Sequence, residues 1–217
     1  MTLADETSPD GSVQRIPFDQ RLARLLVRPL AATPVTPNQI TALSLLLGLL
    51  GAWLFARGGS AIHWGALLFV LATFIDHADG ELARMTGRTS RFGHVFDHLT
   101  GGTIHVMLFI GIGVGLMEGP LGLWGPILGL STGVSVAAIF LLRFEVARRC
   151  EEDSIQQPYF AGFEIEDIMY VVAPVTWLGG LLPFLVLAGI GTPFFLALEV
   201  WTHRRKAKAV RADVRSP

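Results

Sequence analysis

Six long apolar runs constrain this chain more than any other feature of its sequence. A helix that crosses a bilayer needs roughly 20 mostly apolar residues. Only 16% of the residues are charged, against about 25% in a soluble domain. We therefore expect an all-α integral membrane protein with six transmembrane helices, the second and fifth of which extend into polar flanks. The runs lie at about residues 40–56, 61–75, 95–117, 121–142, 165–178 and 181–201.

The basic residues predict how these helices are oriented. Cytoplasmic loops collect Lys and Arg, whereas translocated loops do not. With the N-terminus inside, Arg57 alone among the 17 basic residues falls in an outside loop. We therefore expect both termini on the cytoplasmic side of a membrane, which we take to be a bacterial cytoplasmic membrane. The formal net charge of −1 argues against nucleic-acid binding through overall basicity.

A short amphipathic segment precedes the first apolar run. Its polar side is basic, which favours a helix lying in the cytoplasmic interface plane; packing against the body of the protein is the alternative. Its apolar side consists of Phe18, Leu22, Leu25, Leu26 and Leu30. We divide the chain into a polar tail at residues 1–17, a six-helix membrane domain at 18–203 and a basic cytoplasmic tail at 204–217.

The first apolar run begins with a helix start signal. Thr36 stands at the N-cap position, Pro37 at the first helical position and Gln39 three residues after the cap. This pattern is typical of a capping box, in which the two polar side chains satisfy backbone N–H groups at the start of a helix. We expect the first membrane helix to begin here.

Two aspartates at the end of the second run point to chemistry. Asp76 and Asp79 are three residues apart, so their carboxylates share one face of a helix. Neighbouring carboxylates repel each other, and ionisable groups at membrane depth are costly and usually functional. A bound divalent cation removes the repulsion. Oxygen ligands favour Mg²⁺ or Mn²⁺ over Zn²⁺, and magnesium held by few carboxylates leaves positions for substrate phosphates.

Small residues and an arginine follow the two aspartates. Gly80 and Ala83 remove side-chain bulk, which lets a flat ligand approach the backbone, although close helix packing explains small residues equally well. Arg84 lies eight residues after Asp76 and so near the same helix face. It can clamp a phosphate, or it can simply anchor the cytoplasmic end of the helix.

The spacing of these residues resembles the signature of the CDP-alcohol phosphatidyltransferase family, D-x2-D-G-x2-A-R-x8-G-x3-D-x3-D. The resemblance extends to the Thr-Pro-Asn-x-x-Thr start of the first run and to the number of spans. Seven of the eight fixed positions match, namely Asp76, Asp79, Gly80, Ala83, Arg84, Gly93 and Asp97.

The resemblance implies a role for each matching position. The three aspartates Asp76, Asp79 and Asp97 would hold Mg²⁺ or Mn²⁺ against the diphosphate of a CDP-linked donor. The donor's CDP moiety would be bound by Gly80, Ala83, Arg84 and Gly93. The implied reaction, in phospholipid biosynthesis, transfers a phosphatidyl group from a CDP-alcohol such as CDP-diacylglycerol to an acceptor hydroxyl and releases CMP. The acceptor is not identified by the sequence.

The eighth position of the signature departs from the family. Gly101 stands where the last aspartate, the presumed general base, is expected. Positioned general bases contribute typically 10²- to 10⁴-fold, so the implied alternative is a catalytically impaired relative that binds nucleotide and lipid. Substitute bases are His105, one helical turn beyond Gly101, and the acidic pair Glu166 and Asp167; packing or capping roles explain these residues as well.

Glycines in the third run bear on the assembly of the protein. Gly111, Gly113 and Gly115 recur at every second position. Small residues allow membrane helices to approach closely, either within one chain or between two chains. Together with the family resemblance, they suggest a homodimer, with helix packing inside the chain as the alternative.

Overall fold

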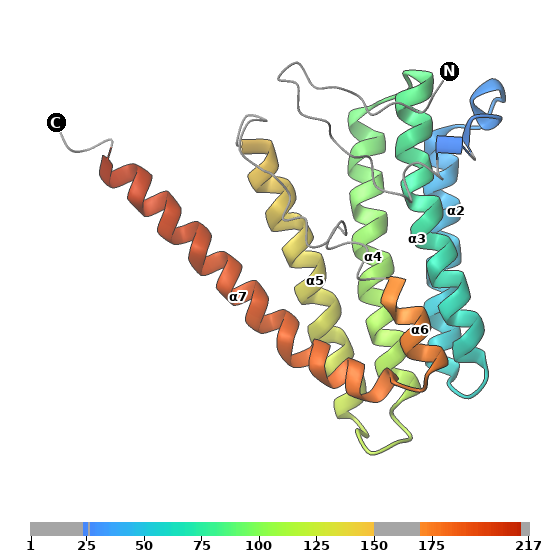
Figure 1. Cartoon of the computed structure of the whole chain (residues 1–217), viewed down its shortest axis with the longest axis vertical. Helices are drawn as coiled ribbons and strands as arrows, with labels where there is room; N and C mark the ends of the chain where they lie inside the picture. The colour runs from blue at the N-terminus through green and yellow to red at the C-terminus, as the bar shows by residue number, and fades with distance from the viewer. Residues whose placement is uncertain (1–23, 26, 150–169, 214–217) are drawn as a thin grey trace.

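The chain folds into a bundle of long helices in a computed structural model that describes residues 24–25, 27–149 and 170–213 (Figure 1). All the elements in these ranges are helical. They are the 3₁₀ turn η1 (Leu30–Ala32) and the helices α2 (Pro37–Arg57), α3 (Ala61–Thr86), α4 (Arg91–Gly115), α5 (Trp124–Arg149), α6 (Val172–Trp177) and α7 (Leu181–Asp213).

Five of these helices are long and apolar enough to cross a membrane. They are Pro37–Arg57, Ala61–Thr86, Arg91–Gly115, Trp124–Leu142 and Leu181–Arg205. The expected all-helical membrane fold is thereby confirmed, but its sixth span is not. The described part of the run at 165–178 forms the six-residue helix α6, which is too short to cross a bilayer by itself, and residues 165–169 lie outside the described residues.

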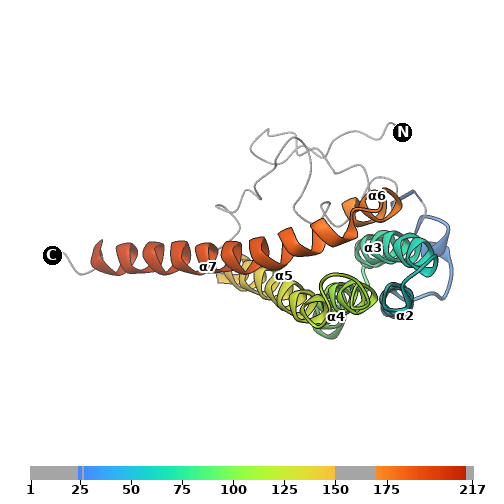
Figure 2. The same cartoon turned by 90° about the horizontal axis from the view of Figure 1, so that it is seen from below.

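Helix α2 lies at one edge of the bundle, opposite α7 (Figure 1). It packs against α3 on one side and α4 on the other, α5 packs against α4, and α7 packs against α5 (Figure 2). The short helix α6 packs against α3. Buried side chains from all six helices meet in one core, including Phe55, Phe69, Leu108, Val172 and Leu185.

Helix α4 touches its neighbours through its glycines. A Cβ added at Gly111 would collide with the carbonyl oxygen of Ala52 in α2, and one at Gly113 with that of Gly125 in α5. Gly115 makes the same close approach to Phe55 of α2. These glycines pack inside the chain, as the alternative reading of the sequence expected, so they give no support to a homodimer.

The predicted start of the first span is confirmed. Helix α2 begins at Pro37, and Oε1 of Gln39 accepts a hydrogen bond from the backbone N–H of Thr36 at 2.9 Å. Just before it, Val27 is buried in a small core with Leu82 of α3. The described end of the amphipathic segment therefore packs against the protein; residues 18–23 and 26 lie outside the described residues.

A short turn joins α3 to α4 and places their polar ends together. Gly87 ends α3 in the left-handed conformation (φ 66°), which glycine adopts without a steric penalty. Ser90 caps α4 by accepting a hydrogen bond from the backbone N–H of Gly93 at 3.0 Å. The two helices are antiparallel and lie side by side below this turn (Figure 1). Residues about two helical turns away from it on each helix therefore lie at one level.

Candidate metal centre

Three carboxylates meet near the turn between α3 and α4. Asp76 and Asp79 come from α3 and Asp97 from α4, and one oxygen atom of each lies within 4.8 Å of the others. Asp79 is buried, whereas Asp76 and Asp97 are partly accessible. We call these three residues the aspartate cluster. The sequence placed its members on two different helices, and the structure brings them together.

Two hydroxyl groups of α2 hold the α3 carboxylates in place. The Ser44 hydroxyl donates to Oδ1 of Asp76 at 2.9 Å, and the Thr41 hydroxyl donates to Oδ2 of Asp79. Both hydroxyl-bearing side chains are buried. Burying a carboxylate costs free energy unless its oxygens accept hydrogen bonds. This pair of donors therefore lowers the desolvation cost of the two aspartates and fixes their orientation.

The role of Ser44 was not predicted from the sequence. Its signal was present, because Thr41 and Ser44 lie three residues apart on an otherwise apolar run and therefore on one helix face. Two hydroxyls on one face of a membrane helix indicate polar partners on a neighbouring helix. The sequence alone does not say which helix that is.

Gly101 lies beside the aspartate cluster. A Cβ built on it would be 3.7 Å from Oδ2 of Asp76, and no other described atom outside its own helix would lie within 4 Å. A side chain at this position would therefore reach the cluster. The position that departs from the family signature is thus adjacent to the carboxylates.

Arg84 and Gly80 lie together on α3, next to a buried acid. A Cβ on Gly80 would lie 3.6 Å from both terminal nitrogens of Arg84. Arg84 donates to Glu81 at 2.8 Å, and Arg24 lies 3.4 Å from the second oxygen of Glu81. Glu81 is only 4% exposed, and its role was not predicted from the sequence. It holds the half-exposed Arg84 beside the two small residues Gly80 and Ala83.

Gly93 lies where α2 and α4 begin. A Cβ on this glycine would be 3.0 Å from Oδ1 of Asn38 and 3.1 Å from Oγ of Ser90. Only a residue without a side chain leaves both polar groups undisturbed. The Thr-Pro-Asn start of α2 and the Gly93 position, which are far apart in the sequence, therefore belong to one region.

One of the candidate substitute bases, His105, packs among aromatic side chains. The His105 ring packs edge-on against Phe69 and Phe140, and its Nδ1 lies 2.6 Å from the carbonyl oxygen of Gly101. These contacts are those of a packed core residue, the alternative that the sequence left open. Glu166 and Asp167 lie outside the described residues.

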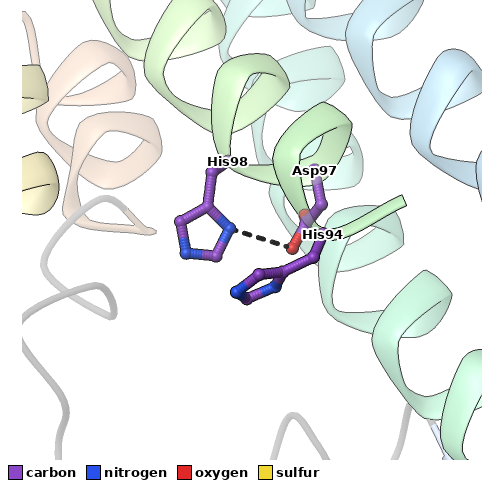
Figure 3. A group of neighbouring side chains, drawn as sticks. All are labelled: His94, Asp97 and His98. Atoms are coloured by element: carbon purple, nitrogen blue, oxygen red, sulfur yellow. Dashed lines mark ion pairs between the residues drawn. The ribbon is translucent and has the colours of Figure 1, made fainter. Parts of the chain in front are cut away.

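Two histidines flank the third aspartate on the first turns of α4 (Figure 3). His94, Asp97 and His98 each offer one ligand atom, and these atoms lie within 4.8 Å of one another. Nδ1 of His98 is 3.6 Å from Oδ2 of Asp97, and the two rings meet at a centroid distance of 4.4 Å. Asp97 therefore belongs to two groups of metal-ligating side chains.

The donor set of the aspartate cluster fits a hard divalent cation. Its three carboxylates offer oxygen atoms, as Mg²⁺ and Mn²⁺ prefer. Their charges converge on one point, where a cation offsets their mutual repulsion. The chain thus carries acidic residues that could hold a divalent metal ion between two membrane helices.

Comparison with known proteins identifies the family. The model of the family described as CDP-alcohol phosphatidyltransferase matches residues 34–206. A bifunctional IPC transferase and DIPP synthase of Rubrobacter xylanophilus is 37% identical over 83 residues, which are 38% of this chain and 19% of that protein. An archaetidylinositol phosphate synthase of Pyrococcus horikoshii is 31% identical over 86 residues, 40% of this chain and 45% of that protein.

A third relative is a phosphatidylinositol phosphate synthase of Streptomyces avermitilis, 38% identical over 63 residues, which are 29% of this chain and 25% of that protein. The chain spans less than half the length of each of these curated relatives. The family model, in contrast, covers α2 to α6 and most of α7. This multi-pass membrane protein therefore belongs to the CDP-alcohol phosphatidyltransferase family.

Proposed function

We propose that this protein transfers a phosphatidyl or related phosphoalcohol group from a CDP-alcohol donor to an acceptor hydroxyl and releases CMP. CDP-diacylglycerol is the donor that we infer, and phospholipid biosynthesis is the process served. The observation that carries the proposal is the convergence of Asp76, Asp79 and Asp97 within 4.8 Å between two membrane helices. Membership of the family supports it, and the comparisons lend no support to a catalytically impaired relative.

Each residue of the site has a role in this proposal. Asp76, Asp79 and Asp97 hold Mg²⁺ or Mn²⁺, which when bound neutralises charge on the phosphoryl oxygens and on the departing CMP. Arg84, held in place by Glu81, contacts a phosphate of the donor. The three small residues leave room for the CDP moiety; they are Gly80, Ala83 and Gly93.

The chemical step is a substitution at phosphorus. The acceptor oxygen forms a bond to the phosphorus next to the alcohol moiety, and the bond from that phosphorus to the bridging oxygen of CMP breaks. CMP leaves with the electron pair, and the acceptor's hydroxyl proton passes to a base. Gly101 offers none, and His105 is engaged in the core contacts described above, so we favour Glu166 or Asp167.

The names of two relatives suggest which acceptor to test first. One is a phosphatidylinositol phosphate synthase and the other an archaetidylinositol phosphate synthase. Both names describe products that carry inositol and phosphate. We therefore propose a phosphorylated polyol as the acceptor class and inositol phosphate as its first representative.

The placement in the membrane is also part of the proposal. We propose six spans, with residues 165–178 as the fifth, and an interfacial helix that begins at Phe18 and ends against α3. Residues 1–17 form the polar tail, and residues 18–203 form the membrane domain. Residues 204–217 form the basic tail, which begins as the continuation of α7. Both termini and the aspartate cluster face the cytoplasm of a bacterium, and a homodimer is the assembly implied by the family.

Release of CMP tests the proposed function. The purified full-length protein in liposomes with Mg²⁺ receives CDP-diacylglycerol and a panel of hydroxyl acceptors led by inositol phosphate. We expect acceptor-dependent CMP release, and a decrease of about 100-fold or more in Asp76→Asn and Asp79→Asn, the scale of losing one electrostatic stabiliser. Donor binding should be lost in EDTA.

The control removes a carboxylate away from the cluster. Glu118→Gln changes an exposed acid in the turn between α4 and α5, and it should leave CMP release unchanged. Donor binding without CMP release, for every acceptor tested, would rule out the transferase. Donor binding that persists in EDTA would rule out the metal assignment.

A further inference from the structure

The first turns of α4 carry a group of side chains that the proposed transfer reaction does not explain. His94, Asp97 and His98 form this group, which we call the histidine cluster. Figure 3 shows the two rings and the carboxylate gathered beside one stretch of α4. Their ligand atoms lie within 4.8 Å of one another, close enough for all three to reach a common ion.

The regular helix produces this arrangement. Residues three and four positions apart lie on one helix face, so His94 meets both Asp97 and His98. The helix is already formed here, because it starts at Arg91 and is capped by Ser90. His94 is exposed, and the other two residues are partly accessible. An ion therefore reaches the group from outside the core.

The chemistry of the ligands separates this cluster from the aspartate cluster. Mg²⁺ prefers oxygen ligands, whereas imidazole nitrogen suits Zn²⁺ and its transition-metal neighbours. Two imidazoles and one carboxylate form a set like those that bind zinc in open sites, where a fourth position is left for water or another oxygen ligand. We propose that His94, Asp97 and His98 form a second metal site, which binds a divalent transition metal of the Zn²⁺ class.

Asp97 connects the two sites. It is the one residue that belongs to both the aspartate and the histidine clusters, and a carboxylate has two oxygens to offer. The remaining ligands are different: Asp76 and Asp79 on α3, His94 and His98 on α4. Substitutions can therefore remove either site while leaving the other site's remaining ligands intact.

Metal binding without any donor or acceptor tests the second site. The purified full-length protein, with its purification tag removed, is titrated with Zn²⁺ by calorimetry and with Co²⁺ by visible absorption. We expect one transition-metal ion bound with nitrogen ligands. His94→Ala and His98→Ala should each weaken Zn²⁺ binding by more than the about 10- to 100-fold that losing an outer-sphere partner costs.

Two controls keep the result specific. His63→Ala removes an exposed histidine near the start of α3, at the other end of the bundle, and should leave Zn²⁺ affinity unchanged. The double variant Asp76→Asn/Asp79→Asn should also keep the Zn²⁺ site. The proposal would be overturned if both α4 histidine variants kept the Zn²⁺ affinity of the unmodified protein. It would also be overturned if the double aspartate variant lost Zn²⁺ binding while the histidine variants kept it. Neither readout depends on CMP release, so failure here is separate from failure of the proposed function.

Discussion

At the scale of single residues, Gly101 is a position where an added side chain would approach the aspartate cluster. A Cβ there would lie 3.7 Å from a carboxylate oxygen of Asp76. An aspartate at 101 would therefore add a fourth carboxylate to the cluster. Among the described residues, no atom outside its own helix lies within 4 Å of a Cβ added at the neighbouring Gly102, so the two adjacent glycines form a matched test pair.

We expect Gly101→Asp to tighten Mg²⁺ binding by about tenfold or more. That gain is a fraction of the roughly 4 kcal/mol that opposite unit charges 4 Å apart are worth at an effective protein dielectric constant of 20. The half-saturating Mg²⁺ concentration for donor binding measures it. Gly102→Asp adds the same charge without reaching the cluster and should leave that concentration unchanged; an equal effect of both variants would contradict this placement of Gly101.

The sequence predicted that Asp76 and Asp79 share a helix face, but it did not predict which side chains on other helices contact them. The i, i+3 spacing of Asp76 and Asp79 requires a shared helix face, and that much follows from local geometry alone. The hydroxyl donors Thr41 and Ser44 lie on another helix, and local spacing contains no information about which helices pack side by side. The pairing of Glu81 with Arg24 depends in the same way on tertiary packing.

At the scale of the elements, glycines set the distances between α2, α4 and α5. Gly111 and Gly115 face α2, and Gly113 faces α5. Each approaches a backbone carbonyl too closely for a side chain. The regular repeat was visible in the sequence, but it fits a dimer interface and an internal contact equally well. The structure places the contact inside the chain because α4 has neighbours on both sides.

Gly111→Ala should destabilise the bundle. Its Cβ would meet the backbone of Ala52, which cannot rotate away, and forcing extra volume into a packed contact costs roughly 1–3 kcal/mol. We expect the thermal unfolding temperature in detergent, followed by circular dichroism, to decrease by several degrees. Gly102→Ala, at a position on the same helix where an added Cβ would meet no described neighbour, should not lower it, since alanine favours helix over glycine. Equal unfolding temperatures would show that α2 and α4 are further apart.

At the scale of the whole molecule, the aspartate cluster lies nearer to one end of the helix bundle than to the other. The turn at residues 87–90 and the turn at residues 58–60 lie at opposite ends of α3 (Figure 1). Arg84, Arg88 and Arg91 surround the first turn. By the positive-inside rule, these arginines support our proposal that the aspartate cluster faces the cytoplasm.

Site-directed labelling measures this orientation. In a Cys150→Ser background, Thr89→Cys and Ser60→Cys place one thiol at each end of α3, both at exposed positions. A membrane-impermeant maleimide added to intact cells should label the cysteine at 60 and spare the one at 89. Permeabilised cells serve as the control, because both positions should then react. The reverse pattern would invert the topology and place the aspartate cluster outside.

The hydrogen bonds from Thr41 and Ser44 also have a thermodynamic consequence. They hold the Asp79 and Asp76 carboxylates in one orientation before any ligand arrives, so less conformational entropy is lost when an ion and a diphosphate bind. The rigid part of the site thus belongs to α2, α3 and α4. The described residues of α5 to α7 contribute no carboxylate to the aspartate cluster, so substitutions in these helices should leave the preorganisation of its carboxylates intact.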